Sequence, residues 1–285
     1  MNFDIGFFGL FDSPYCYENI SISVDGDDFS ACLSEREKIV IEKFWHKLKA
    51  ERKDKVFSVQ GGLGCLWYAN NVLKFRPCDF KTYYAVTSSY ACSLDERLSV
   101  NTYNSMRVGA VGVALKFGNQ ILACRRSPNV THVRGMIDCS AAGLVMNDNG
   151  MDFKASAYQK LMAELGLEQD AVEIKGVTTI HTSRAPDFSG MVGFLAEAKV
   201  GFDSLKIKSD GGFYLVDIDN LPAFIVDHYC DKKDMNGDGA AVLLGCLARD
   251  SMISTIKWME DLGKSFKFVR LDRSGYTERP VFEAS

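Results

Sequence analysis

The sequence predicts a mixed α/β layer arrangement, preceded by a smaller β-rich part. Two apolar segments, 107–115 and 120–125, flank a Gly118-Asn119 turn and predict a strand hairpin. Residues 152–165 have helical periodicity, and Gly166 follows as a C-cap. Further strands and a closing helix come after it. This order of hairpin, helix, strands and helix is typical of layered α/β domains.

Composition and charge exclude several classes of function. The chain has 285 residues, 47% of them hydrophobic, which can fill a sizeable core. Its net charge is −4, and 33 basic residues are scattered among 37 acidic ones, so no positive field is expected for nucleic acid. Asp4 and Asp12 lie where a signal peptide would be apolar, and no run reaches the roughly 18 apolar residues of a membrane span. We expect a cytoplasmic protein with neither nucleic acid nor membrane as partner.

The chain divides into three predicted parts: residues 1–106, 107–263 and 264–285. In the first part, Ser34 and Glu37 form a capping-box pattern before an apolar helical stripe, and short strands are expected at 20–24, 56–60, 65–68 and 72–75. In the second part, strands are expected at 172–181, 191–200 and 212–216, and one helix from 238 to 263. The last part is expected to be a strand and a mobile end.

Two other patterns have simpler explanations than the chemistry they suggest. Residues 234–239 (DMNGDG) copy the first half of an EF-hand loop, but Gly245 stands where that loop needs a bidentate glutamate. A turn in which Asp238 caps the last helix fits better. Cys139, with Asp138 and His132, suggests a thiol nucleophile, yet a small packing residue fits at least as well. Nine cysteines with no C-x-x-C pair predict no disulfide framework and no structural zinc.

The order of motifs from residue 125 onward resembles the Nudix superfamily, whose signature is G-x5-E-x7-R-E-U-x-E-E-x-G-U with U aliphatic. RRS at 125–127 and GMID at 135–138 resemble its lead-in, and residues 159–167 (QKLMAELGL) fall on its second half. The positions that match are Leu161, Glu164, Gly166 and Leu167. Met151 stands where the upstream glutamate is expected, and Gly143 fits the first glycine only if the loop is two residues longer. FWHKLK at 44–49, DFKTY at 79–83 and FYLVDIDNLP at 213–222 loosely resemble the branch that hydrolyses UDP-glucose and UDP-galactose.

The resemblance implies a Nudix-type α/β/α sandwich and a divalent-metal site that this chain has largely lost. In the family, acids three and four residues apart project from one helix face and hold magnesium against a diphosphate. Here Lys160 and Ala163 replace two of those acids. One hypothesis is a protein that binds a nucleoside diphosphate derivative, such as a nucleotide sugar, with hydrolysis impaired or lost and no cofactor. The other is an enzyme, either a weak magnesium-dependent pyrophosphohydrolase using Asp148, Asp152 and Glu164 from a rearranged loop, or one doing metal-free chemistry with Lys160 and His181.

The candidate site residues follow from this register. The catalytic candidates are Glu164, Lys160 and His181, and the substrate-binding candidates are Arg126, Arg134, Arg184 and Asp187. Arg126 is preferred over Arg125 and Arg134, because a guanidinium can bind phosphate oxygens bidentately. For Glu164 and Lys160 the alternative is an exposed helical pair contributing only about 0.3 kcal/mol. For His181, Arg184 and Asp187 the alternative is a set of solvated loop side chains.

Overall fold

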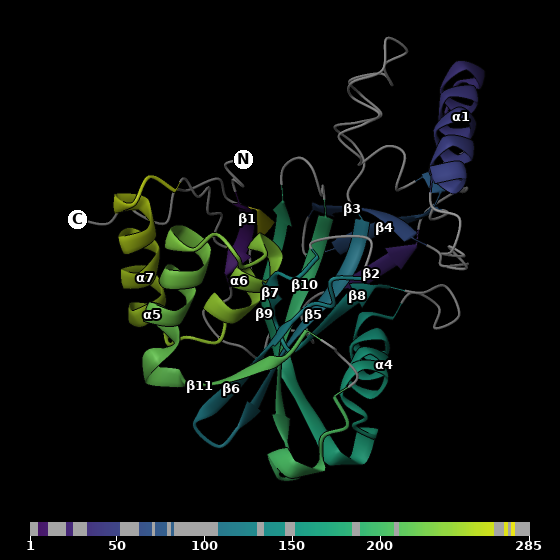
Figure 1. Ribbon diagram of the computed structural model, residues 1–285. Coiled ribbons are helices and arrows are strands. Elements are labelled where there is room, and N and C mark those ends of the chain that lie inside the picture. The colour runs from purple at the N-terminus through teal and green to yellow at the C-terminus, as the bar shows by residue number, and fades with distance from the viewer. Residues whose placement is uncertain are drawn as a thin grey trace.

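The structure is a computed structural model. It describes residues 5–10, 21–24, 33–51, 63–69, 72–78, 81–82, 108–129, 134–145, 152–183, 189–207, 211–264, 271–272 and 275–276. A twisted sheet lies between α4 on one side and α5, α6 and α7 on the other, while α1 stands at the edge of the molecule (Figure 1).

The main sheet is mixed, as predicted. Its strands run in the order β1 (Ile5–Leu10), β9 (Val172–Ser183), β10 (Ser189–Ala198), β5 (Val108–Phe117), β3 (Leu63–Ala69), β4 (Val72–Cys78) and β2 (Ser21–Val24). The β10–β5 and β2–β4 pairs are parallel, and the other pairs along this order are antiparallel.

Four shorter strands complete the part that surrounds the site. They are β6 (Gln120–Arg125), β7 (Ile137–Asp138), β8 (Ala141–Leu144) and β11 (Phe213–Asp217). Strand β8 pairs with the middle of β5, and β6 pairs with the end of β5, with β7 and with β11. The predicted hairpin is confirmed: Phe117 pairs with Gln120 across a turn in which Gly118 has φ 57°.

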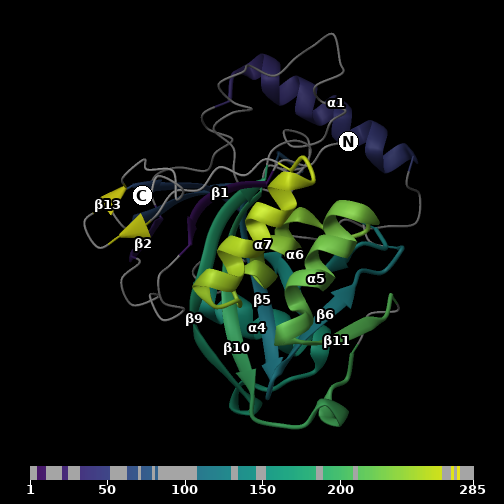
Figure 2. The ribbon, with the colours of Figure 1, turned by 90° about the vertical axis from the view of Figure 1, so that its left-hand side faces the viewer.

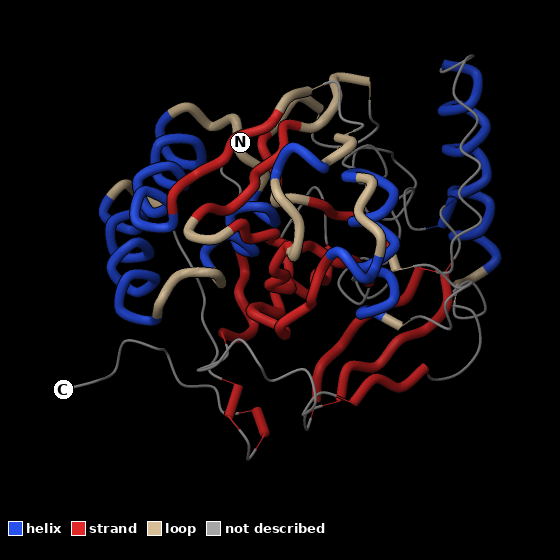
Figure 3. The backbone as a smooth tube through the Cα atoms, turned by 90° about the horizontal axis from the view of Figure 1, so that it is seen from below, coloured by secondary structure: helices blue, strands red, loops and turns tan. Residues whose placement is uncertain are grey.

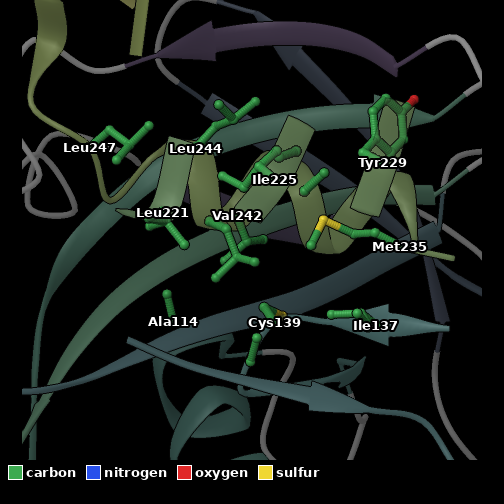
Figure 4. Close-up of a cluster of buried hydrophobic side chains, with 14 of the residues drawn as sticks. Ala114, Ile137, Cys139, Leu221, Ile225, Tyr229, Met235, Val242, Leu244 and Leu247 are labelled. Atoms are coloured by element: carbon green, nitrogen blue, oxygen red, sulfur yellow. The ribbon is translucent and has the colours of Figure 1, made fainter. Parts of the chain in front are cut away.

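Strand β5 separates two apolar cores because its side chains alternate between the faces of the sheet. Val111, Val113 and Leu115 pack with α4 (Phe153–Leu165), whereas Ala110 and Ala114 pack with the opposite helices. Those helices are α5 (Leu221–Val226), α6 (Gly237–Leu244) and α7 (Arg249–Asp261). They lie together over one face in Figure 2, and Figure 4 shows side chains of α5 and α6 above Ala114, Ile137 and Cys139. The view from below shows strands between the helical layers (Figure 3).

Helix α4 begins and ends where the sequence predicts. The Asp152 carboxylate accepts hydrogen bonds from the backbone N–H of Lys154 and Ala155, which caps the first turn. Gly166, at φ 68°, ends the helix in the left-handed conformation, and its N–H donates to the Met162 carbonyl. The buried side chains of α4 lie three to four residues apart and face the sheet: Phe153, Ala157, Leu161 and Leu165.

The C-terminal helices differ from the prediction of one helix from 238 to 263. Helix α6 ends at Leu244, and α7 begins at Arg249. A Cβ on Gly245 would lie 2.6 Å from the Thr179 side chain, so the chain packs closely against β9 directly after α6 ends. The prediction that Asp238 caps this helix is also wrong, because Asn236 is the N-cap residue and Asp238 lies buried in the first turn. Helix α5 and the π-helical turn Asp227–Asp231 were not predicted.

The N-terminal part contains the predicted strands near 20–24, 65–68 and 72–75, and the predicted helix as α1 (Glu35–Glu51). The capping box is confirmed: Ser34 donates to the Glu37 carboxylate from its backbone N–H and its hydroxyl. Strand β1, which was not predicted, pairs with β9, and β3 joins β5 at Cys65 and Val108. The N-terminal strands therefore extend the same sheet, and the division at residue 106 stays a prediction.

In the C-terminal part, β12 (Leu271–Asp272) pairs with β13 (Gly275–Tyr276). The strand predicted at 56–60 lies outside the described residues. Within the described residues, no helix combines the length and the apolar character that a membrane crossing needs.

Candidate functional site

A pocket of about 270 Å³ lies between the last turns of α4 and the ends of β6, β7 and β8. It brings together segments that are far apart in the sequence. Its lining residues are Cys124, Arg125, Arg126, Ser127, Asp138, Cys139, Ser140, Ala142, Ala163, Glu164, Leu165 and Ile207. Four of them are charged: Arg125, Arg126, Asp138 and Glu164. Arg126 and Glu164 are two of the candidate site residues predicted from the sequence.

Arg126 and Asp138 form an ion pair in the wall of the pocket. The Arg126 Nη1 donates to Asp138 Oδ2 at 3.0 Å, and Asp138 is only 3% exposed. The same carboxylate accepts from the Cys139 N–H at 2.9 Å and from Asn236 Nδ2 at 3.3 Å. Burial lowers the pKa of Arg126, but the Asp138 carboxylate more than offsets it, so this pKa lies above its ordinary value. The Arg126 Nε–H is buried and has no hydrogen-bond partner among the described residues.

Glu164 projects from α4 into the same pocket. Burial raises its pKa to about 7, and the charge of Asp138 acts in the same direction. Arg126, Lys160 and the backbone N–H of Ala142 favour the charged form but do not offset the loss of hydration. Near neutral pH the protonated and ionised forms are therefore present in comparable amounts. This residue is not the solvated surface carboxylate that the alternative interpretation describes.

Lys160 lies one turn before Glu164 on α4, and its side chain lies across Gly143 of β8. A Cβ on Gly143 would be 2.5 Å from Lys160 Cε and 2.8 Å from Lys160 Nζ. Lys160 is partly buried, and among the described residues its ammonium forms no ion pair within 4 Å. The predicted register therefore brings Arg126, Lys160 and Glu164 into one neighbourhood, although their functional roles stay predictions.

The other candidates lie elsewhere or outside the description. Arg134 is exposed and is absent from the pocket lining of the described residues. The backbone of His181 belongs to β9 and is aligned through Met191 and Ala110 with Leu144 of β8. Those three strand spacings amount to about 14 Å. Arg184 and Asp187 lie outside the described residues, so their roles stay predictions.

Among the described residues, the carboxylates that line the pocket form no cluster of metal ligands. Among the described lining residues only Asp138 and Glu164 are acidic, and Asp138 already binds Arg126. No cluster of three or more His, Cys, Asp or Glu that could hold a metal occurs within the described part of the chain. Asp152 lies at the other end of α4 from Glu164, about 18 Å away along the axis, and a joint role of Asp148, Asp152 and Glu164 stays a prediction. Asp148 lies outside the described residues.

Two residues of the site escaped the sequence analysis or were placed differently by it. Asn236, which donates to Asp138, is 98 residues away in the chain, and its segment DMNGDG was interpreted from the sequence only as a turn. Arg125 was a candidate beside Arg126, but its guanidinium binds the Gly135 carbonyl, the Tyr214 hydroxyl and Asp234. The alternation of side chains along a strand could have predicted that Arg125 and Arg126 have different partners, because consecutive side chains at a strand end point to opposite sides.

Comparisons with known proteins give similar structures only. No protein-family model matches the sequence, and no curated protein does. DR0079 from Deinococcus radiodurans is 21% identical over 49% of this chain and 83% of its own, with a TM-score of 0.38. RenU, a Nudix hydrolase from M. smegmatis, is 15% identical over 54% of this chain and 85% of its own, with a TM-score of 0.34. An Ap4A hydrolase from C. elegans is 13% identical over 54% of this chain and 99% of its own, with a TM-score of 0.32.

The fold is an α/β/α sandwich with a mixed sheet. Helix α4 covers one face of β5, and α6 covers the other. The solved structures above are similar to about half of this chain, and they carry no information on its ligand.

Proposed function

We propose that this protein binds a nucleoside diphosphate derivative, such as a nucleotide sugar, through its phosphate groups in the α4–β6–β7 pocket. In this proposal, standard magnesium-dependent hydrolysis is impaired or lost. The observation that carries it is the composition of the charged wall. The Nε–H of Arg126 is buried without a hydrogen-bond partner among the described residues, and Glu164 is the one carboxylate of the described pocket lining that is not in an ion pair.

Physical chemistry supports a phosphate ligand at this wall. A phosphate oxygen that accepts from a guanidinium forms a charge-assisted hydrogen bond, which contributes about 1.5 to 3 kcal/mol. The bond is strongest where water is excluded, as it is around the buried Nε–H of Arg126. A pocket of about 270 Å³ is smaller than most sites for whole drug-sized ligands. The phosphates would fill it, and the rest of the nucleotide would lie outside.

A binding panel tests the proposal. Nucleotide sugars, dinucleotides and coenzyme A are added with and without magnesium, and thermal unfolding is followed because a bound ligand raises the melting temperature. A double variant, Arg126→Gln with Asp138→Asn, removes both charges of the ion pair and leaves the net charge unchanged. It should lose the thermal shift, while Lys199→Gln, an exposed lysine remote from the pocket lining, should retain it. A shift that survives the double variant would contradict the proposed site.

A second candidate function is metal-independent hydrolysis with Glu164 as general base. The observation in its favour is the pKa of about 7, close to the value at which a base is both available and effective at neutral pH. The Glu164 carboxylate would take a proton from water as the water oxygen attacks one phosphorus of the diphosphate. The bond from that phosphorus to the bridging oxygen would break, and the leaving phosphate would depart with the bridging oxygen and its electron pair, while Arg126 balances the charge on the phosphate. Product release is measured in EDTA across pH. The rate should rise with pH up to about 7 and then level off, and Glu164→Gln should abolish it. Turnover only with added magnesium would exclude this candidate.

A further inference from the structure

The end of the Lys160 side chain lies against Gly143 of strand β8, and this position is its seat on the sheet. All three heavy atoms closest to the position of a Gly143 Cβ belong to Lys160, namely Cε, Nζ and Cδ at 2.5, 2.8 and 3.0 Å. The ammonium group thus lies where the side chain of any other residue at 143 would begin. Gly143 directly follows Ala142, which lines the pocket. The seat lies one residue along β8 from the pocket wall, and neither Lys160 nor Gly143 is among the described lining residues.

The charges around this seat leave the ammonium available to a ligand. Glu164 follows Lys160 by four residues on α4, and its charge interacts with Lys160 electrostatically, but no ion pair within 4 Å joins them in the described structure. The other carboxylate of the pocket, Asp138, is bonded to Arg126. A lysine ammonium is a compact charge with three donors, and it binds phosphate in other protein sites.

We propose that Lys160 is the cation that binds the ligand phosphate in place of a metal ion, and that Gly143 is the positioning residue that holds it there. This rests on the function proposed above. The position of Lys160 then depends on Gly143, because the Lys160 side chain needs a residue without a side chain at this place on β8. Phosphate binding at this site requires no divalent cation.

A substitution at Gly143 can displace the Lys160 ammonium group without unfolding the protein. Gly143 lies in strand β8, where alanine adopts the backbone conformation freely. The atoms that a methyl group would meet first are the flexible end of Lys160, which can move by rotating its side chain. Gly143→Ala therefore removes the seat and keeps the charge. Gly201→Ala is the matched control, since φ there is −70° and nothing lies within 4 Å of its Cβ position.

The experiment is a calorimetric titration of inorganic pyrophosphate in EDTA into the full chain. Wild type, Gly201→Ala, Gly143→Ala, Lys160→Ala and the double variant Gly143→Ala/Lys160→Ala are compared. Lys160→Ala should weaken binding by about ten- to a hundredfold, and Gly143→Ala by about three- to tenfold. The double variant should bind like Lys160→Ala alone, because Gly143 acts through Lys160. The NMR signals of the Lys160 ε-methylene should shift in Gly143→Ala and stay in place in Gly201→Ala.

The outcomes separate this inference from the function on which it rests. Wild-type affinity for Gly143→Ala, or losses that add in the double variant, would overturn the role of Gly143. Binding that Lys160→Ala leaves unchanged would overturn the role of the cation, while the binding function stands. Binding that appears only with magnesium would overturn the metal-free site. If neither pyrophosphate nor any nucleotide of the panel binds to wild type, the proposed function fails together with the inference.

Discussion

Arg125 and Arg126 are neighbours in the chain, yet they belong to two different kinds of polar cluster. Arg125 donates to a carbonyl, to a tyrosine hydroxyl and to Asp234, which in turn contacts His228 Nδ1 at 2.7 Å. Both arginines line the pocket, but Arg126 has one carboxylate partner and an Nε–H without a hydrogen-bond partner among the described residues. The Arg125 cluster joins β6, β11 and the segment after α5 into one structure. In the Arg126 cluster, the Nε–H donor of Arg126 is available to a ligand, as a binding site requires.

The two clusters also differ in their response to pH. Burial raises the pKa of Asp234, but Arg125 and His228 reverse this and bring it below its ordinary value. Burial raises the pKa of Glu164 to about 7. A carboxylate with a lowered pKa stabilises the fold when ionised, whereas one with a raised pKa destabilises it when ionised. Ionised Asp234 in the Arg125 cluster therefore stabilises the fold at neutral pH, whereas ionised Glu164 beside Arg126 destabilises it.

The largest expected effect is that of removing Arg126. Arg126→Ala leaves the carboxylate of Asp138 buried at 3% exposure with its charge uncompensated. Breaking a buried pair in this way costs about 3 to 5 kcal/mol of unfolding free energy. Urea denaturation measures it. Adding Asp138→Asn should restore most of the loss, and a loss that persists in the double variant would mean that packing, not charge, is responsible.

The next effect concerns Glu164 and has a defined sign. The unfolded chain ionises Glu164 near the ordinary pKa of 4.5, and the folded chain near 7. Between these values the unfolded state releases a proton that the folded state retains, so stability falls as pH rises from about 4.5 to about 7. The total is about 3 kcal/mol at about 1.4 kcal/mol per pH unit.

Glu164→Gln removes the loss of stability that the ionisation of Glu164 causes. The variant should be more stable than wild type at pH 8 by up to about 3 kcal/mol and equal to it near pH 4. Denaturation curves at both pH values test this. Equal stabilities at pH 8 would show that the carboxyl group is solvated in the folded protein.

Sequence reasoning succeeded where local chemistry decides the structure. The hairpin turn at Gly118, the Asp152 and Gly166 caps of α4 and the Ser34–Glu37 capping box depend on residues close in the chain. It failed at the break between α6 and α7, because the contact of Gly245 with Thr179 is between residues far apart in the chain.

The site shows the same limit. The helical register placed Lys160 and Glu164 on the face of α4 that meets β8, but only the packed structure shows that Glu164 is desolvated. The bond between Asn236 and Asp138 depends on how α6 meets β7. No pattern within either segment specifies that contact, so it could not be predicted from the sequence.

A smaller effect is expected from the arginine of the structural cluster. The Arg125 and Asp234 side chains are 28% and 30% exposed, so solvent screens their interaction. Arg125→Ala should reduce the unfolding free energy by about 1 to 2 kcal/mol, mostly through the hydrogen bonds lost to Tyr214 and Gly135. Urea denaturation beside Arg126→Ala gives the direct comparison. A loss for Arg125→Ala equal to that for Arg126→Ala would remove the distinction between the two clusters.

The smallest effect concerns Asp234 in acid. Its lowered pKa means that the ionised form stabilises the fold, so this contribution is present above the unfolded-state pKa near 3.8 and is lost as pH falls through the folded value. Because Asp234 is partly exposed, the contribution should be below about 1 kcal/mol. Asp234→Asn should therefore lose a little stability at pH 7 and none near pH 2, the opposite trend from Glu164→Gln. Denaturation at the two pH values measures this trend, and an Asp234→Asn variant that gains stability as pH rises would show that burial, not Arg125 and His228, dominates at this carboxylate.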